Sequence, residues 1–172
     1  SIYPEFREEF LQAVQEMVLG DPFDPETELG ALISPEHLAK VTSYIELAGI
    51  EGGAILCGGE APGDIPEEFS AGNWLMPTVI EGVSHDSRTA TEEIFGPVVT
   101  LHPFDDEEEV IAMANCTQYG LAGSVWTEDL AKGERIAAAI DSGMVWVNCW
   151  LHRDLRVPFG GVKQSGVGVE GG

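Results

Sequence analysis

Apolar residues recur at helical spacing near the start of the chain and again after residue 34. Between residues 1 and 19 they are Phe6, Phe10, Leu11, Val14, Met17 and Val18. This spacing places them on one side of a helix from Ser1 to Leu19, which Gly20 is expected to end. A second helix is predicted after Ser34, a good N-cap residue followed by Pro35. Its apolar side is expected to comprise Leu38, Val41, Ile45 and Leu47.

Short apolar runs divide the rest of the chain. Strands are predicted at residues 54–57, 78–80, 98–102, 121–126 and 144–147, and helices at 107–115 and 130–139. The segments 20–30 and 58–72 are rich in Gly, Pro and acidic residues, as loops are. Strands that alternate with helices indicate an α/β fold, with a mostly parallel sheet flanked by helices. A chain of 172 residues is enough for one such domain.

Acidic residues dominate the charged positions, with 30 Asp and Glu against 8 Lys and Arg. The formal net charge of -22 argues against nucleic acid and against an anionic membrane surface as partners, because both are bound through cationic patches. The densest acidic run, at residues 105–109, is typical of a solvated face. An acidic surface with few lysines also suits a protein that is soluble at high salt, which is a hypothesis from composition.

The three cysteines, Cys57, Cys116 and Cys149, show neither metal-ligand spacing nor a disulfide framework. This usage favours a reducing compartment. The first residues lack the pattern of a signal peptide, and no apolar run approaches the length that crosses a bilayer. We therefore expect a cytoplasmic protein without a metal site.

Two places carry candidate chemistry by residue type and position. Cys149 follows the strand at 144–147, at the end where α/β folds place their sites. A small buried apolar residue is the favoured interpretation of Cys149, because the nearest histidine is three residues away and catalytic pairs are assembled across a fold. Glu93 and Phe95 precede a Gly-Pro turn. There the Glu93 carboxylate can accept hydrogen bonds from ribose hydroxyls, and the Phe95 ring can pack against a flat heteroaromatic group. The alternative, in which Ile94 and Phe95 pack into the core, stays open.

Several separate motifs occur in one order: EEIFGPV at 92–98, YGLAGSVWT at 119–127, GMVWVN at 143–148 and PFGGVKQSGVG at 158–168. In this order and spacing they resemble the aldehyde dehydrogenase superfamily. GDPFDPETELGALIS at 20–34 resembles that family's GxPxDPxTxxGPLIS segment, so the resemblance covers nearly the whole chain. It implies oxidation of an aldehyde to an acid with NAD or NADP, through a cysteine thiolate that forms a covalent intermediate.

The resemblance also implies roles for single residues. Glu93 matches the family glutamate that binds the hydroxyls of the nicotinamide ribose, and Phe95 matches the aromatic residue beside the nicotinamide. Phe159 matches a residue that lines the cleft near the ring and the substrate. The family nucleophile lies in a GQxC-type motif upstream of the matched segment, and none of the cysteines here occupies its place. We therefore expect residues 1–172 to be a partial catalytic domain without a catalytic residue, inactive alone, from an enzyme that forms homodimers or homotetramers.

Two arginines, Arg153 and Arg156, lie in the segment WLHRDLRVPFGG, in a chain with few cations. By the resemblance, residues 148–159 match the family's substrate-pocket loop. A guanidinium binds a carboxylate through two parallel hydrogen bonds, so an anionic substrate is expected. RDLR before PFGG resembles the branch of the family that oxidises 2-hydroxymuconate and 2-aminomuconate semialdehydes, which carry a carboxylate remote from the aldehyde. Arg153 is the first candidate for that carboxylate and Arg156 the second. In the alternative, Asp154 forms an ion pair with one of the two arginines, and that arginine only stabilises the loop.

Other functions stay open at this point. One is a dehydrogenase for a neutral aldehyde, in which the arginines are structural. Another, from a different class, is a non-catalytic remnant that serves as an interaction module. A hydrolase that uses Cys149 as a nucleophile would need a base and an oxyanion site, and the sequence offers neither in recognisable form.

Overall fold

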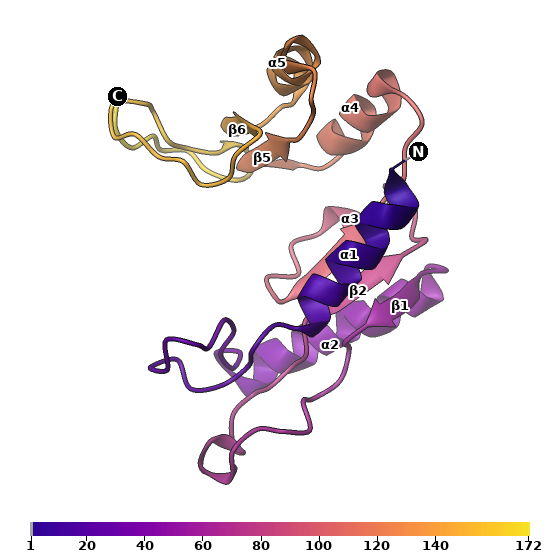
Figure 1. Ribbon diagram of the computed structural model, residues 1–172, viewed down its shortest axis with the longest axis vertical. Helices are drawn as coiled ribbons and strands as arrows, with labels where there is room; N and C mark the ends of the chain where they lie inside the picture. Colours follow the sequence, from indigo (N-terminus) through magenta and orange to yellow (C-terminus); the bar gives the residue numbers. More distant parts are fainter. Residues whose placement is uncertain (1) are drawn as a thin grey trace. The chain divides into compact units, whose positions relative to one another are not determined.

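The computed structural model describes residues 2–172 and divides the chain into two compact units, one ending at Pro103 and the other beginning at Phe104 (Figure 1). Each unit has its own strands and helices. The sequence predicted one mostly parallel sheet. The described residues instead form three short sheets, one in the first unit and two in the second.

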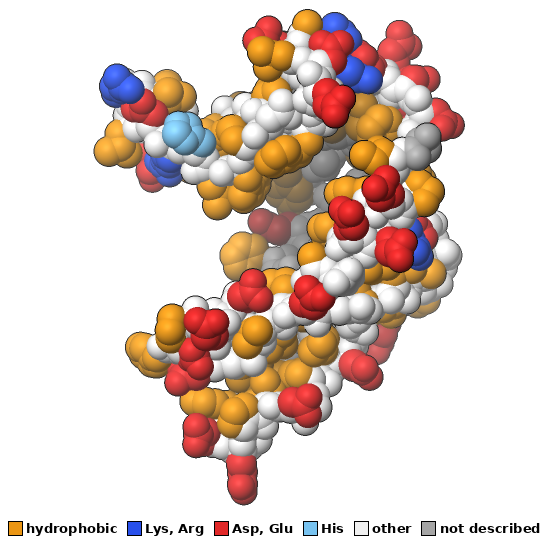
Figure 2. Space-filling model, in the orientation of Figure 1, with side chains coloured by type: hydrophobic (Ala, Val, Ile, Leu, Met, Phe, Trp, Pro, Cys, Tyr) orange, Lys and Arg blue, Asp and Glu red, His pale blue; other side chains and the backbone are white. Residues whose placement is uncertain are grey.

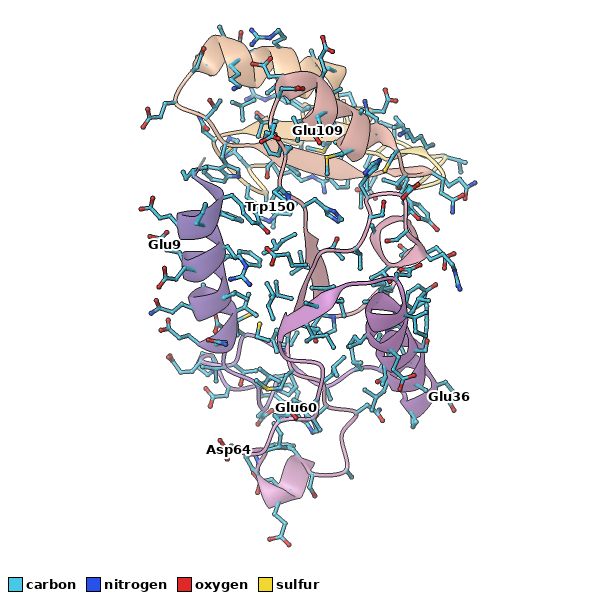
Figure 3. All side chains as sticks on the ribbon, turned by 90° about the vertical axis from the view of Figure 1, so that its right-hand side faces the viewer. Glu9, Glu36, Glu60, Asp64, Glu109 and Trp150 are labelled. Atoms are coloured by element: carbon cyan, nitrogen blue, oxygen red, sulfur yellow. The ribbon has the colours of Figure 1, made fainter. Side chains whose placement is uncertain are left out.

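A three-stranded sheet lies at the centre of the first unit, in the order β1–β2–β3. Its strands are β1 (Ala54–Cys57), β2 (Thr78–Glu81) and β3 (Val98–Leu101). Two helices, α1 (Tyr3–Gln15) and α2 (Pro35–Ile50), lie on opposite sides of this sheet (Figures 1 and 3). The sheet is therefore covered on both faces, which explains why β2 is almost entirely buried.

Helix α2 supplies much of the core of the first unit. Its buried residues recur at helical spacing, and they are Val41, Ile45 and Ala48. Two of these were predicted, whereas Leu38 and Leu47 are only half-buried. The two core clusters are Val41, Ile45, Leu75 and Ile94, and Ala48, Ile80 and Val83. Because Ile94 belongs to the first cluster, α2 anchors the segment that carries Glu93 and Phe95.

Helix α1 ends at Gln15, so the prediction that it continues to Leu19 is wrong. The residues that follow Gln15 turn to meet the loop at 20–30. Leu19 forms a β-bridge with Leu29, and the Val18 amide donates to the Glu28 carboxylate at 3.0 Å. These contacts compete with the last turn of the helix and replace it. Ser1, the predicted first residue, lies outside the described residues.

Two helices and a parallel strand pair form the second unit. The helices α4 (Glu107–Asn115) and α5 (Leu130–Ala139) lie on the same side of β5 (Ala122–Val125) and β6 (Met144–Val147), as Figures 1 and 3 show. Both helices and β6 have the predicted bounds, and β5 lies inside the predicted strand. A further pair, β4 (Tyr119–Gly120) with β7 (Val162–Lys163), was not predicted because two-residue strands show no alternation.

Side-chain caps begin the longer helices that follow α1. In each case a side-chain oxygen accepts from the amide three residues later, as an N-cap does. The pairs are Ser34 with His37 at 3.1 Å, Asp106 with Glu109 at 2.9 Å and Asp129 with Lys132 at 3.1 Å. The predicted cap at Ser34 is thus confirmed.

The α/β class is confirmed, and the strand pairing is more mixed than predicted. β2–β3 and β5–β6 are parallel, whereas β1–β2 and β4–β7 are antiparallel. The connections account for this difference in the first unit. A parallel pair needs a crossover, and the chain between β2 and β3 includes the helix α3 (Arg88–Thr91). The connection between β1 and β2 holds only the 3-10 helix η1 (Glu67–Phe69), and it returns the chain antiparallel.

Acidic side chains are spread over the face seen in Figure 2, with few Lys and Arg among them. This agrees with the charge balance of the sequence. Within residues 2–172, no helix combines the length and the apolar character that crossing a membrane requires.

Candidate functional site

The two residues matched to cofactor binding, Glu93 and Phe95, lie on the segment that joins α3 to β3. Their side chains are exposed, and Phe95 keeps 75% of its surface accessible. Ile94, between them, is buried at 9% exposure. Of the two alternatives left open by the sequence, the core therefore takes Ile94 and leaves Phe95 outside. A large exposed aromatic next to an exposed carboxylate is suited to binding rather than to packing.

Phe95 adopts a backbone conformation that favours glycine, with φ of 59°. A non-glycine residue in this left-handed region is uncommon, and such residues cluster at functional sites. The next residue explains part of the constraint. A Cβ on Gly96 would lie 2.6 Å from a methyl carbon of Val41, so only glycine allows the chain to approach α2 this closely. The Pro97 carbonyl then accepts from the Thr78 amide at 2.8 Å, which joins the turn to β2.

Glu92, the residue before Glu93, is held by an ion pair within the first unit. Its carboxylate accepts from the Arg88 guanidinium at 2.8 and 3.0 Å and from the Tyr44 hydroxyl at 2.5 Å. The Arg88 guanidinium, helped by Tyr44, lowers the pKa of Glu92 to about 2. Glu92 is thus an ionised structural group. Of the two neighbouring glutamates, Glu93 is the exposed one.

A shallow depression of about 310 Å³ adjoins this turn. It is lined by Thr89, Ala90, Glu92, Ile94, Phe95, Gly96, Val98, Val99 and Thr100. Phe95 therefore borders an open surface with mixed polar and apolar walls. Such a surface can accommodate the flat face of a heteroaromatic ring against the phenyl group.

The loop after β6 carries the residues matched to substrate binding. Asn148 begins it in a left-handed conformation, with φ of 54°. Its side-chain amide donates to the Thr127 carbonyl at 2.9 Å and accepts from the Thr127 amide at 2.8 Å. Trp146 and Trp150 pack edge to face at 5.0 Å, and the Trp146 indole donates to the His152 carbonyl at 2.8 Å. These contacts fix the start of the loop to β5 and β6.

The structure brings Arg153 and Phe159 together. The guanidinium carbon of Arg153 lies 3.8 Å from the centre of the Phe159 ring, in a cation–π contact. The same guanidinium donates to the Glu170 carboxylate at 3.2 Å. Phe159 and Glu170 are themselves joined by an antiparallel bridge. Arg153 is therefore a half-exposed cation with one edge directed at a carboxylate and its face supported by a ring.

Arg156 has a different partner. Its guanidinium donates to both oxygens of Asp154, with its Nε at 2.9 and 3.0 Å, and the Arg156 amide donates to the same carboxylate at 2.9 Å. The Arg156 side chain lowers the pKa of Asp154 to about 2. Asp154 thus pairs with Arg156 and not with Arg153. The structural ion pair that the sequence left open is therefore formed by Arg156, the second candidate for the substrate carboxylate.

Other residue types offer little chemistry in this chain. Cys149 is half-buried and Cys57 likewise. Among residues 2–172, His, Cys, Asp and Glu side chains form no group placed to hold a metal ion.

Two residues near the site were missed by sequence reasoning, His37 and Lys40, which contact main-chain carbonyls of Phe95 and Glu93. Their spacing after the Ser34 cap was the only signal that could have found them.

Comparison with known proteins identifies the family of this chain. Residues 1–172 match the aldehyde dehydrogenase family, and the chain therefore belongs to that family. The resemblance indicated by the motifs is confirmed. The chain is 50% identical over 172 residues to the 2-aminomuconic semialdehyde dehydrogenase of Mus musculus, covering 99% of this chain and 35% of that protein. It is 44% identical over 171 residues to the 2-hydroxymuconic semialdehyde dehydrogenase of Pseudomonas sp. (strain CF600), covering 99% and 35%.

A solved structure is similar as well. Betaine aldehyde dehydrogenase from Staphylococcus aureus, in complex with NAD+, aligns with a TM-score of 0.92 at 40% identity. The alignment covers 99% of this chain and 34% of that one. The α/β architecture is thus that of the family. The present chain spans about a third of the length of these relatives.

Proposed function

We propose that the protein containing this chain oxidises a semialdehyde bearing a carboxylate to the corresponding dicarboxylic acid, with NAD+ or NADP+ as oxidant. The observation that carries the substrate class is the Arg153 guanidinium, supported on Phe159 and already within 3.2 Å of a carboxylate. Muconic semialdehydes, named for the relatives above, have an aldehyde at one end and a carboxylate at the other. 2-Hydroxymuconate and 2-aminomuconate semialdehydes are the proposed candidates.

The turn that carries Glu93 and Phe95 is suited to bind the nicotinamide and ribose end of the cofactor. The carboxylate of Glu93 accepts hydrogen bonds only, which suits the donating hydroxyls of a ribose. The exposed Phe95 ring beside the depression suits the flat nicotinamide. When bound, NAD(P)+ would supply the hydride acceptor of the oxidation. The residues of this chain would hold and orient that end of the cofactor.

Arg153 would hold the far end of the substrate. Its contact with Glu170 joins a half-exposed side chain to one that is 80% exposed, so it is weak and readily exchanged. A substrate carboxylate that displaced Glu170 could form two parallel hydrogen bonds with the guanidinium fork. The Phe159 ring would keep that fork from rotating. Fixing the far end in this way orients the aldehyde for attack.

The nucleophile is proposed to come from residues outside this chain. None of the three cysteines stands in a GQxC-type sequence, and the relatives are nearly three times as long. We accordingly expect residues 1–172 alone to be inactive. We also propose that the full-length protein is a cytoplasmic homodimer or homotetramer, in line with the family resemblance and the cysteine usage.

One observation favours a second function. Because Glu170 already neutralises Arg153, the arginine can be structural, and the substrate can then be a neutral aldehyde. The two functions differ in substrate preference. The test is NADH or NADPH formation by the full-length protein on a carboxylate-bearing semialdehyde and on its uncharged ester of the same length. The proposal predicts a higher kcat/KM for the acid, whereas preference for the ester would contradict it.

A further inference from the structure

One face of α2 contacts residues 92–95, the segment that carries the candidate cofactor turn. The contacting side chains of α2 are three or four residues apart, as neighbours on one side of a helix are. His37 Nε2 lies 2.5 Å from the Phe95 carbonyl oxygen, and Lys40 Nζ lies 2.9 Å from the Glu93 carbonyl oxygen. Tyr44 follows them with its bond to Glu92. Figure 3 labels Glu36, the neighbour of His37, at the beginning of this helix.

The contacts of His37 and Lys40 reach the main chain. A carbonyl oxygen only accepts hydrogen bonds, so His37 Nε2 must carry the donated hydrogen. The His37 ring also meets the Phe95 ring edge to face, with centroids 6.0 Å apart at 72°. Both the carbonyl and the side chain of Phe95 are thus in contact with one residue. Holding a carbonyl restricts the rotation of the peptide that follows it, and so the left-handed backbone of Phe95.

The partner of Lys40 is unusual among the cations of this chain. Of the 8 Lys and Arg, all lying in the described residues, seven form an ion pair with a carboxylate. Lys40 instead donates to a neutral carbonyl, that of Glu93. Lys163 also donates to main-chain carbonyls, those of Asn115 and Thr117, but it pairs with Asp141 as well, whereas the contact of Lys40 is to the Glu93 carbonyl.

We propose that His37 and Lys40, the carbonyl clamp, are positioning residues that hold the Glu93–Phe95 turn in the form that binds the cofactor. The inference rests on the proposed function for the identity of the ligand. The clamp acts on the two residues matched to the cofactor and leaves the buried Ile94 between them to the core. Ile94 and the Gly96–Val41 contact fix where the turn lies. The clamp fixes which way its carboxylate and ring point.

The size of the effect follows from the backbone of Phe95. The left-handed conformation disfavours a residue with a Cβ by an amount that corresponds to a population factor of about 5 to 30. If the clamp offsets this preference, its loss lowers the fraction of competent turns and raises the apparent Kd for the cofactor by about the same factor. The fold should tolerate the loss, because the clamp side chains lie near the surface.

The experiment uses the full-length protein and the variants His37→Ala and Lys40→Met. The Kd for NAD+ is measured by equilibrium titration, and amide hydrogen exchange of residues 92–98 is measured without cofactor. We expect Kd to rise about 5- to 30-fold in His37→Ala, and exchange in this segment to become faster. His37→Gln, whose amide can still donate, should restore much of the affinity. Glu46→Gln, at an exposed position of the same helix, is the matched control and should change neither readout.

A double variant separates positioning from general stability. In a Phe95→Gly background the backbone enters the left-handed region without cost, so adding His37→Ala should change Kd little. Equal effects of His37→Ala in both backgrounds would contradict the clamp, as would unchanged exchange or unchanged Kd in the single variants. If the wild-type protein binds neither NAD+ nor NADP+, the proposed function fails. The exchange comparison still decides in that case whether the clamp orders the turn.

Discussion

Replacing Arg153 with alanine tests the proposed substrate class. In the full-length enzyme, Arg153→Ala should lower kcat/KM for a carboxylate-bearing semialdehyde and change it little for a neutral aldehyde. The reason is the geometry of the guanidinium, which lies 3.8 Å from the centre of the Phe159 ring and presents an edge to carboxylates. Removing it would leave the substrate carboxylate without its charged partner.

The magnitude follows from two opposing contributions. A hydrogen-bonded ion pair with the bound substrate is worth about 1.5–3 kcal/mol. Binding must first displace Glu170, and an exposed ion pair of that kind is worth about 0.2–1 kcal/mol. The net loss is therefore about 0.5–2.8 kcal/mol, which corresponds to a roughly 2- to 100-fold decrease in kcat/KM.

The assay compares initial rates of NADH or NADPH formation on the acid and on its ester. Arg156→Ala is the matched control. Its guanidinium is already paired with Asp154, so Arg156→Ala should change the rates on the acid and on the ester by the same factor. Arg153→Lys, which keeps the charge and loses the fork, should fall between wild type and Arg153→Ala. Equal losses on acid and ester in Arg153→Ala would refute the carboxylate role and favour the neutral-aldehyde alternative.

Three further predictions concern stability. Gly96→Ala should destabilise the protein by about 1–3 kcal/mol in urea unfolding, because the new Cβ would lie 2.6 Å from the fully buried Val41. Gly63→Ala is the control, and it should be nearly neutral because its Cβ would meet nothing within 4 Å. The pKa of Glu92 is lowered from 4.5 to about 2, so its ion pair stabilises the fold above pH 4.5 and is lost as the pH falls toward 2. The stability difference between wild type and Arg88→Met should therefore be largest above pH 4.5 and shrink below it, and a constant difference would contradict this. The unfolding midpoint should also rise with KCl, because salt screens the repulsion within a chain of net charge -22, and a midpoint that stays level would count against the high-salt hypothesis.

Local signals were sufficient for most elements of this fold. Helix α2 was predicted from its Ser34 cap and its apolar periodicity, and α4 and α5 were predicted from the short runs between the apolar strands. The first helix was predicted too long because its end depends on Leu29 and Glu28, which are remote in sequence. The direction of β1 and the strand β7 also depend on partners from distant segments. No local pattern encodes such pairing.

The candidate site was accessible from sequence only through its motifs. Residue type alone could not decide whether Phe95 packs inside or stays outside, because the decision rests on Gly96 meeting Val41. The partners of the two arginines were equally undetermined. Asp154 is next to Arg153 in sequence and two residues from Arg156, and Glu170 lies 17 residues from Arg153. The sequence did not single out His37, since nothing near it in sequence reveals its contact with the Phe95 carbonyl.

The most direct test of the account is a crystal structure of the full-length protein with NAD+ and the dicarboxylic acid product. The account predicts the Glu93 carboxylate within hydrogen-bond distance of the ribose hydroxyls, and the nicotinamide beside the Phe95 ring. It also predicts the Arg153 guanidinium on the remote carboxylate of the product, with Glu170 displaced. A product carboxylate bound elsewhere, with Arg153 still paired to Glu170, would contradict the assigned substrate class. A cofactor remote from Glu93 and Phe95 would contradict the proposed site itself.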